Sequence, residues 1–241
     1  MKATLFITAL AGITLAGTAD ASLLAGDTIG IDFNGSVATT GTNFNAFSED
    51  TDDGATASLL SLINLSGATV TGVTFSLENQ TGQNTERADF TTQGAEGTLA
   101  GPLSEQAVWD DGYISNNQGA APLDVDGFFL LTFSGLDDEL TYDLTGGFDN
   151  NGGNANFDAT WSADGQSFTT LTTNSDPAGA GYGTLTGLST DGDGNLEITV
   201  ARNTLHVTVG GLTLTSVVPE PSSLALLGLG GLMMIKRRRR A

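Results

Sequence analysis

Short runs of alternating apolar and polar residues are the feature that most limits how this chain can fold. In the runs 73–77, 140–144 and 196–200 every second residue is apolar, and the residues between are polar or small. Side chains of a β-strand point alternately to the two faces of a sheet, so each run presents one apolar face. Turn residues separate these runs, and the pattern predicts an all-β domain built as a single β-sandwich.

Two further stretches are expected to form strands. Residues 127–134 are apolar at consecutive positions, which is typical of a central strand covered from both sides. The run 59–65 has a spacing that also fits a short helix, but the surrounding pattern favours a strand. These stretches extend the same all-β prediction.

Two turns are expected between such runs. Asp164 and Gly165 separate 157–162 from 167–172, and an Asp-Gly pair strongly favours a two-residue hairpin. Residues 191–195 similarly separate 183–188 from 196–201. We therefore expect hairpin turns at both places.

The domain organisation follows from length and composition. No internal repeat is visible, and residues 22–216 suffice for one domain. The chain has no cysteine, which excludes disulfides and thiolate metal sites. Of its 28 acidic residues 26 lie between Ala21 and Pro219, against two of its eight basic residues, Arg87 and Arg202. Because such an acidic body would repel phosphate backbones, nucleic acid is not an expected partner.

The N-terminus has the layout of a secretory signal peptide. Lys2 is followed by an apolar stretch, 3–16, and then by the small-residue pattern Ala19-Asp20-Ala21. This order predicts a signal peptide over residues 1–21, cleaved after Ala21, rather than a buried N-terminal helix. The protein is therefore expected to be exported.

The C-terminus, 217–241, combines three parts. Pro219, Glu220 and Pro221 precede the twelve apolar or small residues 224–235, and a basic cluster follows. That cluster is Lys236, Arg237, Arg238, Arg239 and Arg240. A twelve-residue helix spans about 18 Å, less than the roughly 30 Å hydrocarbon core, so it would be a weak transmembrane helix. The basic cluster would hold this end in the cytoplasm, which suits an anchor that is used briefly and then removed.

These three parts in this order resemble the PEP-CTERM sorting signal of bacterial exported proteins. The resemblance implies recognition by an exosortase, a multi-pass membrane enzyme of transpeptidase type. It also implies cleavage near the motif and delivery to the cell envelope, the cell surface or the extracellular matrix, after a transient stay in the inner membrane. A simple C-terminal membrane tail is the alternative interpretation.

The body also resembles exported jelly-roll domains of the galactose-binding-like type. The resemblance rests on 29–33, on 131–137 followed by 140–144, and on 161–165, all of which are generic strand and turn patterns. It implies a jelly-roll-like sandwich and says little about activity, because such folds carry many functions.

Few residues point to catalysis. The single histidine, His206, lies in an alternating run with Leu205, Val207 and Val209, which places it on the solvent face. The sequence also contains no G-x-S-x-G elbow and no H-E-x-x-H motif, so a serine or zinc hydrolase is not expected. A two-carboxylate glycosidase stays open, with pairs such as Glu105 and Asp110 or Asp111, although abundant acids make any pair uninformative.

Calcium is the one metal ion for which a short segment of the sequence offers possible ligands. Oxygen-bearing side chains recur at every second position in Asp191, Asp193, Asn195 and Glu197, as a hard cation requires of a tight loop. The EF-hand pattern then fails, with Leu196 in place of the invariant glycine and Arg202 in place of the bidentate glutamate. A plain turn rich in Asp and Gly is the favoured interpretation.

Exposed aromatic side chains would be needed for sugar binding. The candidates are Trp109, Tyr113 and Tyr182, and packing against the sandwich is the favoured alternative for each. The sequence therefore predicts a non-enzymatic structural protein of the envelope or matrix. A carbohydrate-binding module acting on exopolysaccharide is the first alternative, and a glycosidase is the second.

Overall fold

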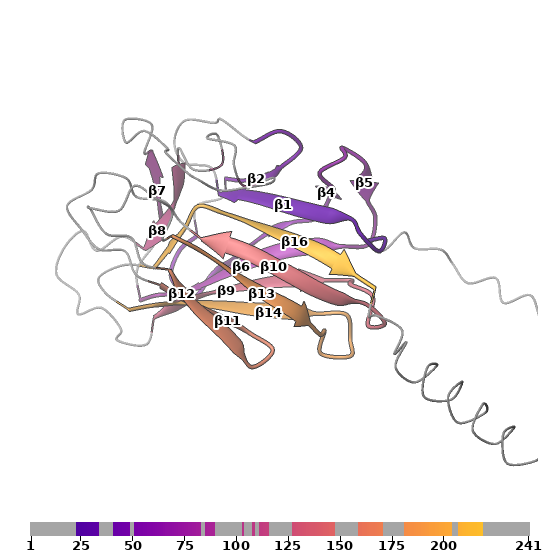
Figure 1. Ribbon diagram of the computed structural model, residues 1–241. Helices are drawn as coiled ribbons and strands as arrows, with labels where there is room; N and C mark the ends of the chain where they lie inside the picture. Colours follow the sequence, from indigo (N-terminus) through magenta and orange to yellow (C-terminus); the bar gives the residue numbers. More distant parts are fainter. Residues whose placement is uncertain are drawn as a thin grey trace, which may run out of the picture.

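The structure is a computed structural model of the 241-residue chain (Figure 1). It describes residues 23–33, 41–48, 51–82, 85–89, 103, 108, 111–115, 127–147, 159–170, 181–203 and 207–218. Within these ranges the regular structure is β-strand and no α-helix occurs, which confirms the all-β body. The expected signal peptide and the C-terminal residues from 219 onward lie outside the described residues.

Five strands form one sheet in the spatial order β13, β10, β16, β1, β2. Their bounds are β1 (Thr28–Phe33), β2 (Asn45–Phe47), β10 (Thr141–Gly147), β13 (Tyr182–Leu188) and β16 (Gly211–Val217). Neighbours run antiparallel except β1 and β2, which are parallel. The last strand, β16, lies between β10 and the first strand, β1, so the two ends of the body complete the same sheet.

Six antiparallel strands form a second sheet in the order β12, β11, β14, β9, β6, β3. Their bounds are β3 (Thr56–Leu59), β6 (Thr74–Gln80), β9 (Phe128–Ser134), β11 (Ala159–Ala163), β12 (Gln166–Thr170) and β14 (Leu196–Arg202). Two small sheets complete the described strands. One holds β4 (Leu62–Ile63) and β5 (Thr69–Val70), and the other β7 (Thr85–Asp89), β8 (Asp111–Ser115) and β15 (Thr208–Val209).

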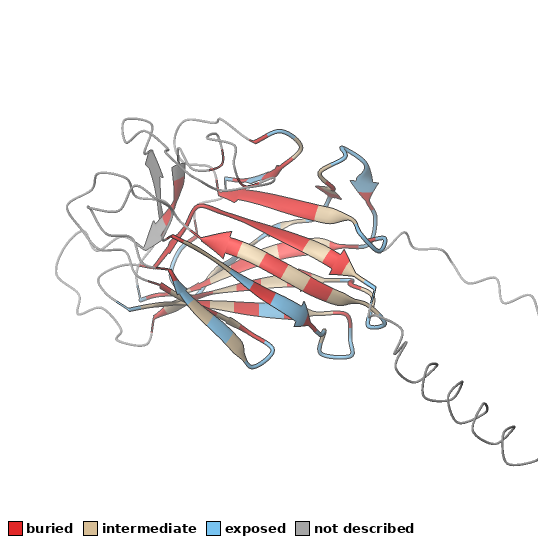
Figure 2. Ribbon diagram, in the orientation of Figure 1, coloured by how far each residue is buried: buried red, intermediate tan, exposed pale blue. Residues whose placement is uncertain are grey.

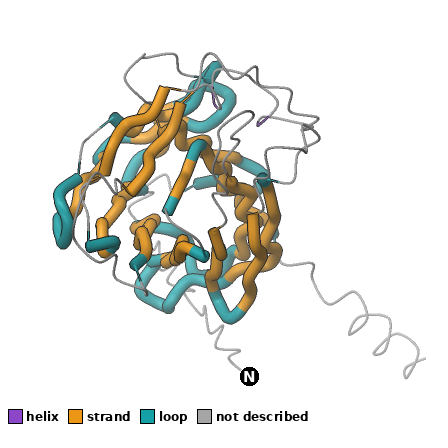
Figure 3. The backbone as a smooth tube through the Cα atoms, turned by 90° about the vertical axis from the view of Figure 1, so that its left-hand side faces the viewer, coloured by secondary structure: helices purple, strands orange, loops and turns teal. Residues whose placement is uncertain are grey.

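Side chains of both large sheets meet in one hydrophobic cluster. The ring of Phe33 on β1 lies 5.9 Å from that of Phe75 on β6, and Phe47 on β2 lies 5.6 Å from Phe75. Alternate residues of β6, β9, β10 and β14 are buried, as Figure 2 shows by colour. The end view in Figure 3 shows the strands arranged around this common interior. The predicted alternation is confirmed in the three runs that define it.

The outer face of β9 corrects one expectation. The strand is central in its sheet, but only one of its faces is buried, while Phe128 and Leu130 on the other face are half-buried. Gln80 and Glu78 of β6 stand opposite these two residues. The prediction of a strand covered on both sides is therefore wrong, because polar neighbours on the same sheet replace a second covering layer.

The two expected hairpins have different outcomes. Asp164 and Gly165 have φ angles of 46° and 71° and join β11 to β12, so this hairpin is confirmed with the positive φ angles of a type I′ turn. Residues 191–195 join β13 of the five-stranded sheet to β14 of the six-stranded sheet. The prediction of a hairpin at 191–195 is therefore wrong, because this connection crosses from one sheet to the other. The run 59–65 forms no helix, but it is not one strand either: it holds the last residue of β3, a bend at 60–61, and β4 in a different sheet.

One end of the two large sheets gathers several short connections. We call it the exit end, because β16 finishes there at Val217, paired with Thr141 of β10. It comprises residues 23–27, 59–61, 135–140, 163–166, 188–196 and 217–218. The connection 135–140 joins the pair Thr74–Ser134 of the six-stranded sheet to Thr141 of the five-stranded sheet. We call the opposite end, where β1, β6 and β14 finish, the far end; the exit end lies at the right of Figure 1.

Candidate functional site

The loop that carries the predicted calcium ligands is closed by its own hydrogen bonds. The backbone N–H groups of Asp193 and Asn195 donate to Oδ1 of Asp191 at 2.8 and 3.0 Å. The side-chain amide of Asn195 donates to Oδ2 of Asp191 at 3.0 Å. Hydrogen bonding, first from the Asn195 side chain, lowers the pKa of Asp191 below its usual value of 3.8. Asp191 therefore acts as the acceptor that closes the turn.

A shallow pocket of about 240 Å³ opens beside this loop. Its lining residues are Asp164, Ser189, Thr190, Asp191, Asn195, Leu196 and Glu197. Three of the four predicted calcium ligands thus share one pocket, together with Asp164 of the neighbouring hairpin, whereas Asp193 does not line it. The lining is acidic and hydroxyl-rich and contains no basic residue.

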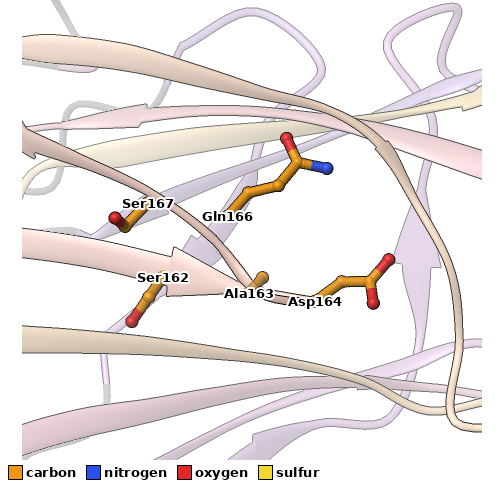
Figure 4. A pocket seen from close by; sticks show the side chains of 6 residues that line it. Ser162, Ala163, Asp164, Gln166 and Ser167 are labelled. Carbon is orange, nitrogen blue, oxygen red and sulfur yellow. The ribbon is translucent and has the colours of Figure 1, made fainter.

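A second hollow, of about 360 Å³, lies at the β11–β12 hairpin and shares Asp164 with the first. Figure 4 shows its lining side chains, with the Asp164 carboxylate directed away from Ser162 and Ser167. That carboxylate accepts a hydrogen bond from the backbone N–H of Ser189 at 2.9 Å. The hairpin tip is thereby tied to the crossing between the sheets.

Metal binding has limited support here. Within the described ranges no three His, Cys, Asp or Glu side chains come together in a way that could hold a metal ion. Both carboxylate oxygens of Asp191 already accept hydrogen bonds from the loop. Calcium at this loop stays a prediction.

Asp138 and Tyr142 also organise the exit end. Oδ1 of Asp138 accepts hydrogen bonds from the Thr190 hydroxyl and, at 3.0 Å, from the N–H of Gly194. The Tyr142 hydroxyl donates to the carbonyl of Asp137 at 3.0 Å and accepts from the N–H of the same residue at 2.9 Å. Burial raises the pKa of Tyr142 to about 12.

Sequence reasoning did not single out Asp138 or the hydroxyl of Tyr142, and it identified Asp164 only as a turn residue. The partners of Asp138 and Asp164 lie 25 to 56 residues away along the chain. No local pattern announces such contacts, because they depend on which strands the fold brings to the same end. The connection 135–140, which contains Gly135 and two aspartates, and the turns at 164–165 and 191–195 offer turn signals, but these signals do not reveal which turns meet.

The structure describes two of the three aromatic candidates for sugar binding, and it places them in different surroundings. Tyr113 on β8 is fully buried and packs edge-on against Phe33 and Phe47 at centroid distances of 5.9 and 5.6 Å. A ring in this position has no exposed face on which a sugar could stack, which corrects its place among the candidates. Tyr182 is half-buried and packs against the small cluster that contains Phe44. Trp109 lies outside the described residues, as do His206, Glu105 and Asp110.

The small cluster around Phe44 covers the outer face of β1. It contains Phe44, Leu103 and Val108, with Leu65 and Tyr182 packed against it. A Cβ added at Gly30 would lie 2.6 Å from the Phe44 ring, so this glycine permits the close approach. Tyr182, on β13 of the same sheet, therefore packs against this second apolar layer over the five-stranded sheet.

The C-terminal candidates follow directly after the body. β16 ends at Val217, Val218 is exposed, and both Pro219–Pro221 and the basic cluster 236–240 lie outside the described residues. In the part of the chain that the structure describes, no helix is long and apolar enough to cross a membrane. No spacer therefore separates the last strand of the sheet from the segment that resembles a sorting signal.

Comparison with known proteins identifies that segment. Residues 217–240 match the family described as the PEP-CTERM protein-sorting motif. No curated protein and no solved structure matches the chain. The match begins at the last residue of β16 and covers the proline-glutamate-proline motif, the apolar stretch and the basic cluster. The chain thus joins an all-β body to a PEP-CTERM sorting motif, which indicates an exported protein processed by an exosortase.

Proposed function

We propose that this protein is a structural component of the cell envelope or extracellular matrix without enzymatic activity. Its apolar residues 224–235 hold it briefly in the membrane until an exosortase-type enzyme cleaves near Pro219–Pro221. The observation that carries the proposal is the sorting-motif match over 217–240, joined without a spacer to a strand of the body.

The contacts of the acidic side chains support the structural role. Asp138, Asp164 and Asp191 all accept hydrogen bonds from backbone N–H groups of exit-end connections. Carboxylates used in this way hold turns in place and keep an exported protein soluble. They are thereby accounted for without a substrate.

We also propose that residues 22–216 form one β-sandwich of jelly-roll type. Its support is the single hydrophobic cluster shared by the two large sheets. At one margin Phe168 of β12 stands so close to Gly183 of β13 that an added Cβ would meet its ring at 2.1 Å. This contact joins the edge strands of the two sheets.

The carbohydrate-binding alternative receives no specific contact from the described aromatic candidates. Tyr113 is fully buried, and Tyr182 packs against the Phe44 cluster. Exopolysaccharide therefore stays an alternative partner predicted from sequence, and a glycan array on the mature protein would test it.

Replacement of the motif tests the processing step. We expect the double variant Pro219→Ala, Glu220→Ala to remain membrane-held with its basic tail intact, while the wild type loses that tail. Ser222→Ala with Ser223→Ala is the matched control, since it alters the same spacer but leaves the motif. Intact-mass measurement in the source cell decides the outcome. An identical processed C-terminus in the motif variant and the wild type would refute the proposal.

A further inference from the structure

Among the described residues the exposed large apolar side chains lie at one end of the body. They are Leu24, Leu60 and Val218, with exposed fractions of 67%, 79% and 55%. Single exposed apolar residues are ordinary on a protein surface, but a grouping of them marks an interaction surface. Their positions in the fold therefore need to be compared.

Strand pairing places all three at the exit end. Ser216 accepts a hydrogen bond at its carbonyl from the N–H of Gly26, and its hydroxyl donates to the carbonyl of Leu24, so Leu24 and Val218 flank the same strand end. Leu60 follows β3, whose last residue pairs with Phe75 near the start of β6. The connection 135–140 leads from Ser134, which pairs with Thr74 of β6, to Thr141, which pairs with Val217 of β16.

The length of chain beyond the structure brings this end close to the membrane. Five residues, 219–223, separate Val218 from the apolar stretch that begins at Leu224. Even fully extended, that spacer spans at most about 20 Å. A short tether also gives the exit end a high effective concentration at the lipid surface, so a weak apolar contact can be populated.

We propose that, in the membrane-held precursor, the exit end rests against the lipid headgroups through Leu24, Leu60 and Val218. This orientation rests on the proposed function, because it requires residues 224–235 to be inserted. The far end then points away from the membrane. Cleavage of the signal removes the tether and, with it, the contact.

Charge predicts which lipids favour the contact. Asp27, Asp138, Glu139, Asp164, Asp191 and Asp193 all belong to the exit end. The two basic residues of the body, Arg87 and Arg202, lie on β7 and at the far end of β14. Anionic headgroups would repel such a surface, so zwitterionic lipids should give the closer contact.

Site-specific fluorescence can test the orientation, because the chain contains no cysteine. The full chain from Ser22 onward, without the signal peptide, would carry one environment-sensitive label. The label would sit either at Ser61→Cys beside Leu60 or at Asp52→Cys at the far end, and both positions are exposed. Each would be reconstituted in phosphatidylcholine vesicles with a headgroup quencher, and in vesicles containing 30% phosphatidylglycerol. We expect roughly fivefold stronger quenching at position 61 than at position 52, and weaker quenching at position 61 with the anionic lipid.

Two controls distinguish a wrong orientation from a failure of the chain to be held in the membrane. Leu24→Ser with Leu60→Ser, in the Ser61→Cys background, should lose most of the quenching while the protein still floats with the vesicles. A chain of residues 22–218, which lacks both the signal peptide and the C-terminal apolar stretch, should not float. Equal quenching at positions 61 and 52 in floating protein would overturn the orientation alone. Failure of the full chain to float would overturn both the orientation and the membrane-held precursor on which it rests.

Discussion

The molecule has two regions that are held together by different kinds of side chain. One is the interior between the two large sheets, and the other is the exit end. In the interior, aromatic rings such as Phe33, Phe47 and Phe75 pack in tilted or edge-on pairs at centroid distances of 5.6 to 5.9 Å. At the exit end, carboxylates such as Asp138 and Asp191 hold the connections through backbone N–H groups, and apolar side chains stand in solvent.

Because of this difference, the side chains that stabilise the fold are not the ones that lie beside the sorting signal. Burial of large apolar side chains dominates the free energy of folding, whereas exposed hydrogen bonds contribute about 1 kcal/mol each or less. The exit end can therefore carry a signal that is later removed, because little of the stability depends on its exposed side chains. The strand that leads into the signal is the exception, since β16 belongs to both regions.

Removal of β16 should have the largest effect. We expect a chain that ends at Gly210 to lack a folded body, because β16 pairs with both β1 and β10 and buries Leu212 and Leu214. A chain that ends at Val218 should fold. Near-ultraviolet circular dichroism and limited proteolysis of the two truncations would show the difference, and a folded Gly210 truncation would contradict this account of β16.

Single apolar substitutions should then distinguish the two regions. Phe75→Ala should lower the free energy of unfolding by about 3–5 kcal/mol, since Phe75 is fully buried and touches three other rings. Leu60→Ala should change it by less than about 0.5 kcal/mol, because this side chain is exposed. Denaturant unfolding of both variants measures the two losses of unfolding free energy. Equal losses would contradict the distinction between the interior and the exit end.

Replacing a glycine by alanine tests how closely the exit-end connections pack against each other. Gly135 has a φ of 82°, and an added Cβ would lie 1.9 Å from the carbonyl oxygen of Gly72. Gly72 has a φ of 79°, with open space around its missing Cβ. Gly72→Ala should cost about 1–2 kcal/mol from the left-handed conformation alone. Gly135→Ala should cost more in thermal or denaturant unfolding, and equal losses would show that the contact yields easily.

The pH dependence of Asp191 should give the smallest effect. Its pKa is lowered in the folded state, so the unfolded chain binds the proton more readily as the pH falls. The stabilisation is thus complete above the usual pKa of 3.8 and is lost as the pH drops through the lower, folded value. The wild type should melt slightly above Asp191→Asn at pH 7, and this advantage should shrink once the pH falls below 3.8 and disappear below the lowered pKa of the folded state. An advantage that persists in acid would contradict the hydrogen-bond explanation.

Alternation in the sequence was enough to predict β6, β10 and β14, because the period of a strand is local. It identified the buried faces of β6, β10 and β14, and the Asp164–Gly165 pair identified the hairpin. Pairing between strands is not local, so residues 191–195 were wrongly expected to close a hairpin when they cross between sheets. The same limit hid the contacts of Asp138 with Thr190 and Gly194, which lie more than fifty residues away. The tail was recognisable because its three parts are consecutive.

The intact mass of the mature protein tests most directly the claim that a stable body carries a removable signal. We expect a chain that begins at Ser22 and has lost the basic cluster 236–240, but that retains every residue through Val217, because cleavage before this point would remove part of β16. A mature protein that keeps Arg240, or one whose C-terminus lies before Val217, would contradict the account.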